Sequence, residues 1–242
     1  LGDITVVTPS IIQSKATQKM VTEFQYLRAH SVEPASSFLD FITVEYMIEN
    51  VMLLLKGTLS GRDVNELMEQ CHPLGMFKES TMRLCTTFDN TPKGYADLYQ
   101  TVLVETPVGK YFSQILQEKS AKLETAAEVR HVLEEVEIEI LKNSLMKLYL
   151  EDFFYFCESL GGTTAEIMCE ILKAKSDQRA INITLNSFGT PLNEPTMRDG
   201  DGWPTRKSLY PSIGFIYPEG TELLVKVADE GSLGQALEKI GG

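Results

Sequence analysis

The run 149–190 constrains the fold more than any other part of the chain, because three helix-like segments meet there at glycines. Gly161 and Gly162 can adopt the left-handed conformation that commonly ends a helix. Thr163 is then predicted to cap the next helix, with Glu166 three residues later completing a capping box. The pattern predicts a helical hairpin followed by a further helical segment, and not a catalytic loop.

Apolar side chains stand at helical spacing in each segment of this run. The first segment ends in an apolar band that is wide enough to be buried on nearly every side, and the second carries a stripe at four-residue intervals. The third segment, 177–188, mixes apolar and polar residues. In order, the apolar residues are Phe153, Phe154, Tyr155, Phe156 and Leu160; Ile167, Met168, Ile171 and Leu172; and Ile181, Ile183, Leu185 and Phe188.

Charge and cysteine content exclude several classes of function. The net charge of −12 argues against nucleic-acid binding and against an electrostatic grip on anionic lipids. It is compatible with basic protein partners, although a solvated acidic surface is the simpler interpretation. The four cysteines, at 71, 85, 157 and 169, form no Cys-x-x-Cys pair and lie mostly beside apolar residues. This favours free thiols in a reducing, cytosolic setting and leaves disulfides open.

The rest of the chain also follows helical periodicity, which predicts an all-α fold. The first predicted helix, 11–30, is amphipathic and is broken by Pro34. The next is predicted to start near residue 36, with Asp40 in its first turn, and to stop at Gly57. Further helices are predicted at 62–70, 77–86, 95–103, 126–160 and 223–240, and a short one is predicted to begin at Pro107. The run 191–207 is predicted to be an exposed loop. The longest apolar run, 51–55, is far below the ~20 residues that cross a bilayer, so no membrane span is expected.

Two parts of the chain align as an internal repeat. Residues 50–58 correspond to 182–190, and the corner 72–75 corresponds to 210–214. Each copy would form one lobe: an apolar helix ended by glycine, a small helix, a Pro-Gly corner and a further helix. Repeated lobes have a physical reason, since each needs a neighbour to bury its exposed face. The alternative to a true repeat is a chance match, because glycine and proline commonly end helices.

No catalytic, cofactor-binding or metal-binding residue is predicted. The three histidines, His30, His72 and His131, lack metal-ligand spacing, and the adjacent pair Cys71-His72 cannot easily chelate one ion. His72 is more simply a corner residue that hydrogen-bonds the backbone. The Gly-Gly run lacks the lysine of a phosphate-binding loop.

Several strings in the chain are similar to those of a known family. They are LGGTTAEIMCEIL (160–172), DQRAINITLNSFGT (177–190), LYPSIGFIYPEG (209–220), FLDFIT (38–43) and CHPLG (71–75). Through these strings the chain resembles, over nearly its whole length, the subunit d family of vacuolar-type proton-pumping ATPases, to which a subunit of the archaeal-type ATPases is related. It departs from the family at 174–179, where Ala-Lys-Ser-Asp-Gln-Arg replaces Phe-Glu-Ala-Asp-Arg-Arg, and in its longer linker 191–207.

The resemblance implies a fold as well as a class. Members of the family are built from three similar all-helical lobes that form a funnel-like bundle. This chain would supply between one and a half and two of those lobes, as a partial chain without the family's initial segment and last part. The expected domains are 1–125, a first lobe with flanking helices, and 126–242, a long helix and second lobe with the loop 191–207.

The resemblance also implies a non-catalytic rotor subunit of a vacuolar-type proton ATPase. Such a subunit would connect the central stalk subunits of the ATP-hydrolysing sector to the proteolipid ring for proton transport. It would be peripheral, on the cytosolic face of vacuolar, endosomal or other acidic-organelle membranes. The large stator membrane subunit and regulatory subunits are further candidate partners. No cofactor and no nucleic acid are expected.

Two other hypotheses stay open. One is a helical-repeat adapter that binds partner helices outside any rotary complex. The other is an all-helical enzyme with an acidic metal site at Glu135 and Glu139, which share a helix face. A charged run on a long helix is usually solvated, and no nucleophile motif accompanies this one.

Six polar residues inside otherwise apolar motifs are predicted to link helices within and between lobes. They are Asp40, Asn50, Asp177, Arg179, Asn182 and Asn186. Asp177 and Arg179 lie two positions apart, so they face in different directions and should pair with other elements and not with each other.

Overall fold

Helices make up the fold. The computed structural model describes residues 8–87, 106–120, 135–193 and 205–241, and within these ranges there is no β-strand. This confirms the predicted all-α class. In chain order the elements are α1 (Pro9–His30), α2 (Ala35–Leu59), α3 (Val64–Gln70), the 3-10 helix η1 (Pro73–Gly75), α4 (Glu79–Leu84), α6 (Gly109–Ser120), α8 (Glu135–Leu160), α9 (Gly162–Ser187), the 3-10 helix η3 (Pro191–Asn193), α10 (Arg206–Leu209), α11 (Glu219–Val225) and α12 (Glu230–Gly241). The predicted helix 95–103 and the first part of 126–160 lie outside the described residues.

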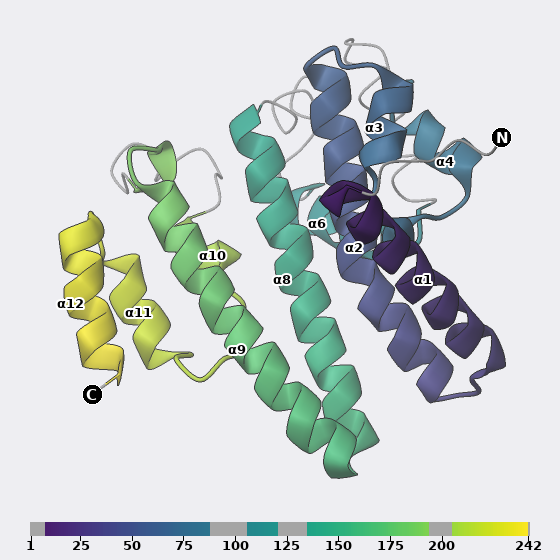
Figure 1. Ribbon diagram of the computed structural model, residues 1–242. Helices are drawn as coiled ribbons and strands as arrows, with labels where there is room; N and C mark the ends of the chain where they lie inside the picture. The colour runs from purple at the N-terminus through teal and green to yellow at the C-terminus, as the bar shows by residue number, and fades with distance from the viewer. Residues whose placement is uncertain (1–7, 88–105, 121–134, 194–204, 242) are drawn as a thin grey trace, which may run out of the picture.

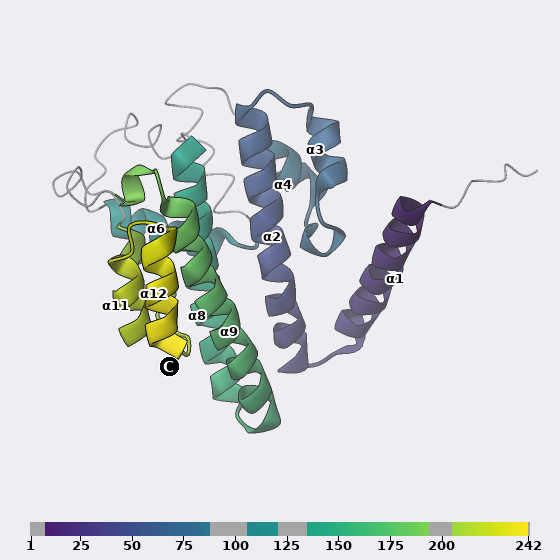
Figure 2. The same ribbon diagram turned by 60° about the vertical axis from the view of Figure 1, so that its left-hand side comes forward.

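The pair α8 and α9 lies in the middle of the molecule (Figure 1). On one side α2 packs along α8, with α1 outside it, and on the other side α10 and α11 lie against α9, with α12 outside α11. Figure 2 shows the same order from another direction, with α1 and α12 on opposite sides of the pair. The hairpin predicted from 149–190 therefore joins the two sides of the fold.

Helix α8 contributes to both hydrophobic clusters of the fold. Ile138 and Leu141 belong to a cluster that α8 forms with α2, α3, α4 and α6. Ile140 belongs to a second cluster, which includes side chains of α9, α10, α11 and α12. Neighbouring positions on a helix point in different directions, so one helix can serve two cores. The division into domains at residue 125 stays a prediction.

Aromatic side chains hold α2 against α8. Phe41 stacks on Phe153 with 5.0 Å between ring centroids, and it also contacts Phe156 at 4.8 Å. Phe153 and Phe154 are buried, but Tyr155 is 56% exposed. The prediction that this band is buried on nearly every side is therefore wrong, because one face of α8 remains open to solvent.

Helix α9 is continuous from residue 162 to residue 187, although the sequence predicted two segments. The run between them contains neither glycine nor proline, so nothing interrupts the helix. The predicted cap by Thr163 is also wrong. Gly161 occupies the N-cap with φ +68, no side chain caps the helix, and Thr163 lies inside the first turn.

The start and end of α2 also differ from the prediction. The helix begins at Ala35, so Asp40 lies beyond its first turn, where it pairs with Arg28 of α1 through two nitrogen–oxygen contacts of 2.5 and 2.6 Å. At its other end α2 continues past Gly57 to residue 59. Glycine is disfavoured inside a helix by only about 1 kcal/mol, which packing can offset.

A polar side chain of α2 fixes the corner that leads into η1. Asn50 is 2% exposed, and its side chain donates to His72 O at 3.0 Å and accepts from His72 N at 2.7 Å. Gly75 lies so close to α2 that an added Cβ would be 2.3 Å from Tyr46 O. Only glycine allows the corner to approach this closely.

The second corner, at 210–216, is fixed by α9 in the same way. Asp177 accepts from Phe215 N at 3.1 Å and from Ile216 N at 3.4 Å. An added Cβ at Gly214 would be 2.2 Å from the Asp177 carboxylate. The residue that corresponds to Asn50 in position and role is therefore Asp177, and not Asn182, with which the sequence alignment paired it.

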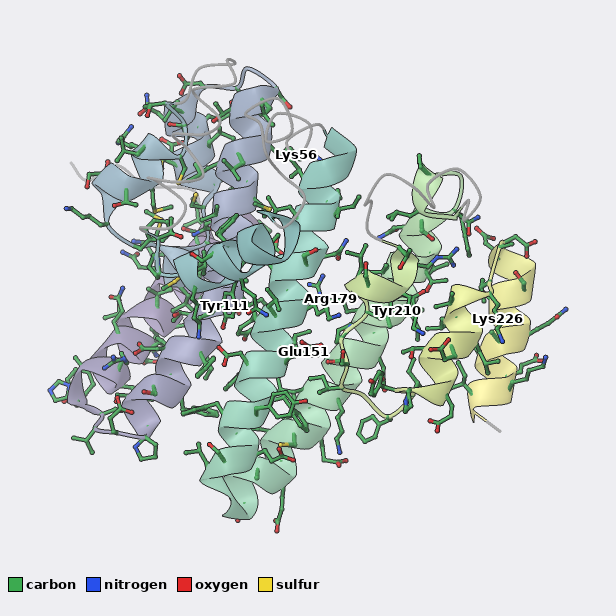
Figure 3. All side chains as sticks on the ribbon, turned by 180° about the vertical axis from the view of Figure 1, so that it is seen from behind. Lys56, Tyr111, Glu151, Arg179, Tyr210 and Lys226 are labelled. Atoms are coloured by element: carbon green, nitrogen blue, oxygen red, sulfur yellow. The ribbon has the colours of Figure 1, made fainter. Side chains whose placement is uncertain are left out.

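One described residue of the predicted exposed loop 191–207 is buried. Within the predicted loop, Arg206 opens α10 and is only 5% exposed. Its guanidinium donates to Val227 O at 2.8 Å, to Leu224 O at 3.3 Å and to the side chain of Asn193. Just after it, Tyr210 shares a hydrogen bond of 2.7 Å with Thr184 of α9, and Figure 3 shows Tyr210 on this side of the molecule.

The predicted helix 223–240 is two helices, because a new cap intervenes. Asp229 precedes α12 and accepts from Ser232 N at 2.7 Å, while the Ser232 hydroxyl accepts from Asp229 N at 3.1 Å. This reciprocal pairing starts a helix and ends the turn after α11.

Helix α1 is formed as predicted, but few of its side chains pack against the rest of the fold. Val21 is its only buried residue, and the predicted apolar face is largely open, with Ile12 59% and Leu27 54% exposed. The amphipathic pattern therefore identified the helix correctly without identifying what it packs against in this chain.

Candidate functional site

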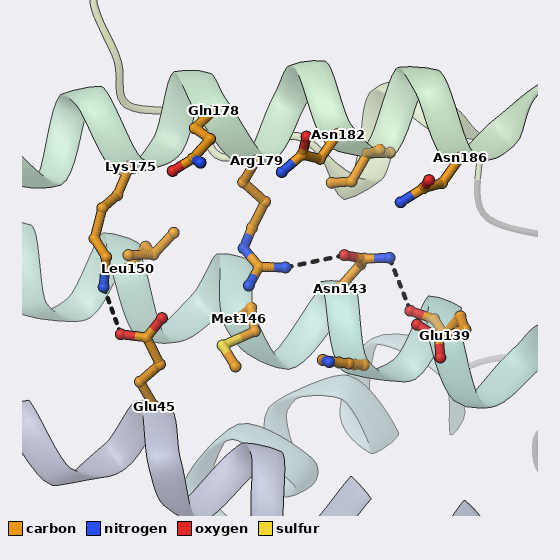
Figure 4. A pocket seen from close by; sticks show the side chains of 12 residues that line it. Glu45, Glu139, Asn143, Met146, Leu150, Lys175, Gln178, Arg179, Asn182 and Asn186 are labelled. Carbon is orange, nitrogen blue, oxygen red and sulfur yellow. Dashed lines mark hydrogen bonds and ion pairs between the residues drawn. The ribbon is translucent and has the colours of Figure 1, made fainter. Parts of the chain in front are cut away.

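A polar groove lies where α2, α8 and α9 meet. It has a volume of about 280 Å³, and side chains of all three helices line it (Figure 4). Helix α8 forms the floor with Met146 and Leu150, which are buried. Helix α9 and Glu45 of α2 form the walls. The sequence places these residues far apart, and only the packing of the hairpin beside α2 brings them together.

Three ion pairs connect α2 to the hairpin along this groove. The distances are 2.5 Å for Lys175–Glu45, 2.7 Å for Lys142–Glu49 and 3.4 Å for Lys56–Glu139. All six side chains are partly exposed, so each pair contributes at most about 1 kcal/mol to stability. Together they neutralise the lysines and carboxylates that border the groove.

Arg179 is the exception to this pairing. Its guanidinium donates to the side chain of Asn143 at 3.1 Å, and no carboxylate oxygen among the residues that the structure describes lies within 4.0 Å of it. Burial lowers the pKa of Arg179, and the more distant carboxylates of Glu45 and Glu49 oppose that shift. Arg179 remains charged at neutral pH, because the ordinary arginine pKa is so high. It is therefore a half-buried cation with only a neutral partner.

Three amide side chains continue the α9 wall at four-residue intervals. Gln178, Asn182 and Asn186 all line the groove, and none forms a hydrogen bond within the described part of the chain. Four residues advance a helix by about 6 Å, so these amides form a row one turn apart. The groove thus offers amide donors and acceptors above an apolar floor.

A second pocket continues the groove between α2 and α8. It has a volume of about 300 Å³ and shares Glu139 and Lys142 with the first. Met52, Leu53 and Ile138 contribute its apolar part. The two pockets therefore border the same stretch of α8.

The structure brings together half of the residues predicted from the sequence. Arg179, Asn182 and Asn186 line the groove, whereas Asp40 lies at the α1–α2 contact, Asn50 at the first corner and Asp177 at the second. Asp177 and Arg179 contact different elements, in agreement with their spacing. The assignment of all six to inter-helix links stays a prediction.

Four charged residues at the groove were not predicted from the sequence. Glu45, Lys142 and Lys175 line it, and Glu49 pairs with Lys142. One signal was available, since Glu45 and Glu49 lie four residues apart on one helix and Lys175 and Arg179 lie four apart on another. Two such faces of opposite charge can pair when their helices are neighbours, but the sequence did not establish that α2 and α9 flank the same helix.

Asp177 gives a pH-dependent prediction. Burial raises its pKa, and its hydrogen bonds from Ile216 N and Phe215 N oppose the shift. A raised pKa in the folded state means that ionisation opposes folding, so the contribution of Asp177 falls as pH rises through that pKa. Asp177→Asn cannot ionise. The free energy of unfolding of this variant, minus that of the unmodified protein, should therefore be larger at pH 7 than at pH 3. Urea unfolding at both pH values measures this difference.

The control for that measurement is Asp177→Ala, which has no acceptor for the two backbone N–H groups. It should cost about 1 kcal/mol, since it removes two partly exposed hydrogen bonds to the second corner. If the stability of Asp177→Asn relative to the unmodified protein were lower at pH 7 than at pH 3, the expected direction of the pKa shift would be contradicted.

His72 and the cysteines take part in the packing of the fold. His72 Nδ1 accepts from Leu74 N at 3.2 Å, as predicted for a corner residue, and burial lowers its pKa. All four cysteines are free thiols, and burial raises the pKa of Cys71 to about 11. Residues 8–87, 106–120, 135–193 and 205–241 contain no group of three His, Cys, Asp or Glu side chains that could hold a metal ion.

Comparison with known sequences identifies the family. The profile of the ATP synthase (C/AC39) subunit family matches residues 3–240. The chain belongs to the ATP synthase (C/AC39) subunit family. This agrees with the all-α fold and with the resemblance carried by 160–172 and 177–190. No helix in the described ranges is long and apolar enough to span a membrane.

Individual members of the C/AC39 family are similar over nearly the whole chain. The V-type proton ATPase subunit d of Dictyostelium discoideum is 44% identical over 229 residues, which are 94% of this chain and 57% of that protein. The probable V-type proton ATPase subunit d of Oryza sativa subsp. japonica is 42% identical over 232 residues, 96% of this chain and 58% of that protein. The V-type proton ATPase subunit d of Saccharomyces cerevisiae is 36% identical over 235 residues, 96% and 61% respectively. The chain thus spans about three fifths of the length of these relatives.

Proposed function

We propose that this chain acts as subunit d of a vacuolar-type proton ATPase. In this role it is a non-catalytic rotor component that couples the central stalk of the ATP-hydrolysing sector to the proteolipid ring. The observation that carries the proposal is the 44% identity, over 94% of the chain, to a protein named V-type proton ATPase subunit d. The predicted position, peripheral on the cytosolic face of an acidic organelle, belongs to the same proposal.

The packing of the hairpin supports a mechanical role. Helices α8 and α9 each contain 26 residues, so each is about 39 Å long, and α8 has buried side chains in both hydrophobic clusters. Protein cores are close-packed and resist deformation. A force applied on one side of the hairpin would therefore reach the other side through packed side chains and not through a loop.

Co-purification from solubilised membranes tests this function. A tag on the protein should recover proteolipid and central stalk subunits, because a rotor component is held between them. Removing the protein should abolish ATP-driven proton uptake by membrane vesicles. Uptake is followed with a pH-sensitive dye, and an untagged parallel preparation controls for non-specific recovery.

The adapter hypothesis predicts a different result. A helical-repeat adapter would recover other partners without proteolipid or stalk subunits, and its removal would leave proton uptake intact. That outcome would exclude the rotor function.

A further inference from the structure

The charge balance of the groove leaves one cation unmatched. The lysines at 56, 142 and 175 each have a carboxylate within 3.4 Å, whereas the one partner of Arg179 among the described residues is the amide of Asn143. In a chain with a net charge of −12, an arginine held away from the nearest carboxylates is unusual. A guanidinium presents a planar fork that matches a carboxylate with two parallel hydrogen bonds. Arg179 therefore has unused capacity for an anionic group that comes from outside.

The row of amides extends this capacity along α9. Gln178, Asn182 and Asn186 have no partner in the described chain, and they stand about 6 Å apart beside Arg179. Amide side chains can both donate to and accept from a peptide backbone or polar side chain. Beneath them, the buried side chains of Met146 and Leu150 close the groove and exclude water from its base. This combination of polar rim and apolar floor is typical of protein–protein interfaces.

We propose that the groove binds an acidic segment of a protein partner, with a Glu or Asp carboxylate of that segment paired to Arg179. The amides of α9 bind the polar groups of the same segment. The identity of the partner as another subunit of the ATPase rests on the proposed function, whereas the chemistry of recognition rests on the groove alone.

The groove favours a peptide segment over a small anion. Phosphate binding draws on several converging cations, and here the three lysines are already neutralised. A second pocket, which shares Glu139 and Lys142 with the first, lengthens the surface along α8. A surface of this length, with an amide at each turn, suits a chain better than a single ion.

A photo-crosslinking amino acid at position 182 tests the occupant in the assembled ATPase complex. We expect a cross-link from position 182 to a partner segment that carries Asp or Glu within about one helical turn of the linked residue. The same amino acid at Gln235, on α12 at the far side of the molecule, serves as the control and should not reach that segment. A cross-link only to segments without acidic residues, or no cross-link from position 182 in an intact complex, would overturn the proposal.

Variants of Arg179 test the pairing itself, with a synthetic peptide of the cross-linked segment as the probe. Arg179→Gln should weaken peptide binding to the purified protein about tenfold or more, because one partner of a partly buried ion pair is lost. Arg179→Lys keeps the charge but loses the fork, so it should recover only part of the affinity. Replacing the acidic residue of the peptide with lysine should restore binding to Arg179→Glu.

Lys226→Gln is the matched control, since it removes one positive charge near α11, away from Arg179 (Figure 3). It should leave the peptide affinity unchanged, and thermal unfolding of each variant checks that the fold is intact. Equal weakening by Lys226→Gln would show a non-specific charge effect and overturn the proposal. So would Arg179-dependent binding of inorganic phosphate or succinate as tight as that of the peptide.

The outcomes separate this proposal from the proposed function. If the protein is not recovered with proteolipid and stalk subunits, the rotor function fails, and the peptide measurements still decide the chemistry of the groove. If the complex is recovered but Arg179→Gln binds every partner segment normally, the groove proposal fails and the rotor function stands.

Discussion

Arg206→Ala should lower the free energy of unfolding by about 3 kcal/mol, because it removes a buried guanidinium that satisfies several acceptors at once. Arg206 is buried, and its guanidinium holds the carbonyls of Leu224 and Val227 at the end of α11 together with the side chain of Asn193. Alanine would remove the guanidinium donor from all three acceptors, of which Leu224 O keeps a backbone donor in Val227 N, and would open a cavity beside α10. Urea unfolding followed by circular dichroism measures the loss.

The neighbouring Lys207→Ala is the control for that experiment. Lys207 also pairs with a carboxylate, that of Glu222 at 2.5 Å, but both side chains are about half exposed. Such surface pairs contribute at most about 1 kcal/mol. Similar losses for Arg206→Ala and Lys207→Ala would show that the buried hydrogen bonds are not what stabilises this side of the fold.

Asn50→Ala should cost about 2 kcal/mol, because it leaves the backbone N–H of His72 without a partner at a buried corner and removes one of the two donors to His72 O, the other being Gly75 N. Asn50→Asp should be comparably damaging, since a carboxylate cannot donate to His72 O. Asn182→Ala, at the position that the sequence alignment paired with Asn50, should change stability by less than about 0.5 kcal/mol, because Asn182 is exposed and makes no hydrogen bond in the described chain. Thermal and urea unfolding of the three variants give the comparison.

The two asparagines also test the role predicted from the sequence. If Asn50→Ala left stability unchanged but uncoupled proton pumping from ATP hydrolysis, its assignment as a link within the fold would be wrong. A large loss of stability for Asn182→Ala would mean that the groove is closed by contacts that Asn182 makes with the rest of the fold.

Local sequence patterns predicted the helices better than their ends. The apolar spacing identified α1 and α2, but it divided α9 into two segments, and the end of α2 and the start of α9 were misplaced at Gly57 and Thr163. A glycine inside a helix is tolerated when packing compensates, and a threonine caps only if the backbone turns at that residue. Both outcomes depend on tertiary contacts that local patterns do not contain.

Burial was harder to predict than helicity. Arg206 lies in the run 191–207, which was predicted to be an exposed loop from its Pro and Gly turns, yet in this fold backbone carbonyls satisfy its buried guanidinium. Ile12 and Leu27 were placed on a core-facing stripe and are more than half exposed. In both cases the deciding factor is which distant element lies opposite, and residue type alone does not specify it.

The groove itself was only partly foreseen. Arg179, Asn182 and Asn186 were selected as polar residues within apolar motifs, and all three line it. Their convergence with Glu45 and Lys142 required the positions of α2 and α8 relative to α9. The repeat alignment was off by five residues for a related reason, since Asp177 and not Asn182 contacts the second corner.

The sharing of α8 between two hydrophobic clusters has a consequence for any attempt to divide the protein. A piece that starts at residue 126 would carry Ile138 and Leu141 into water, and a piece that ends at residue 125 would lack the wall against which Phe41 stacks. Neither piece could complete its own interior. The two sides should therefore melt together, in a single cooperative step, even though their sequences read as separate lobes.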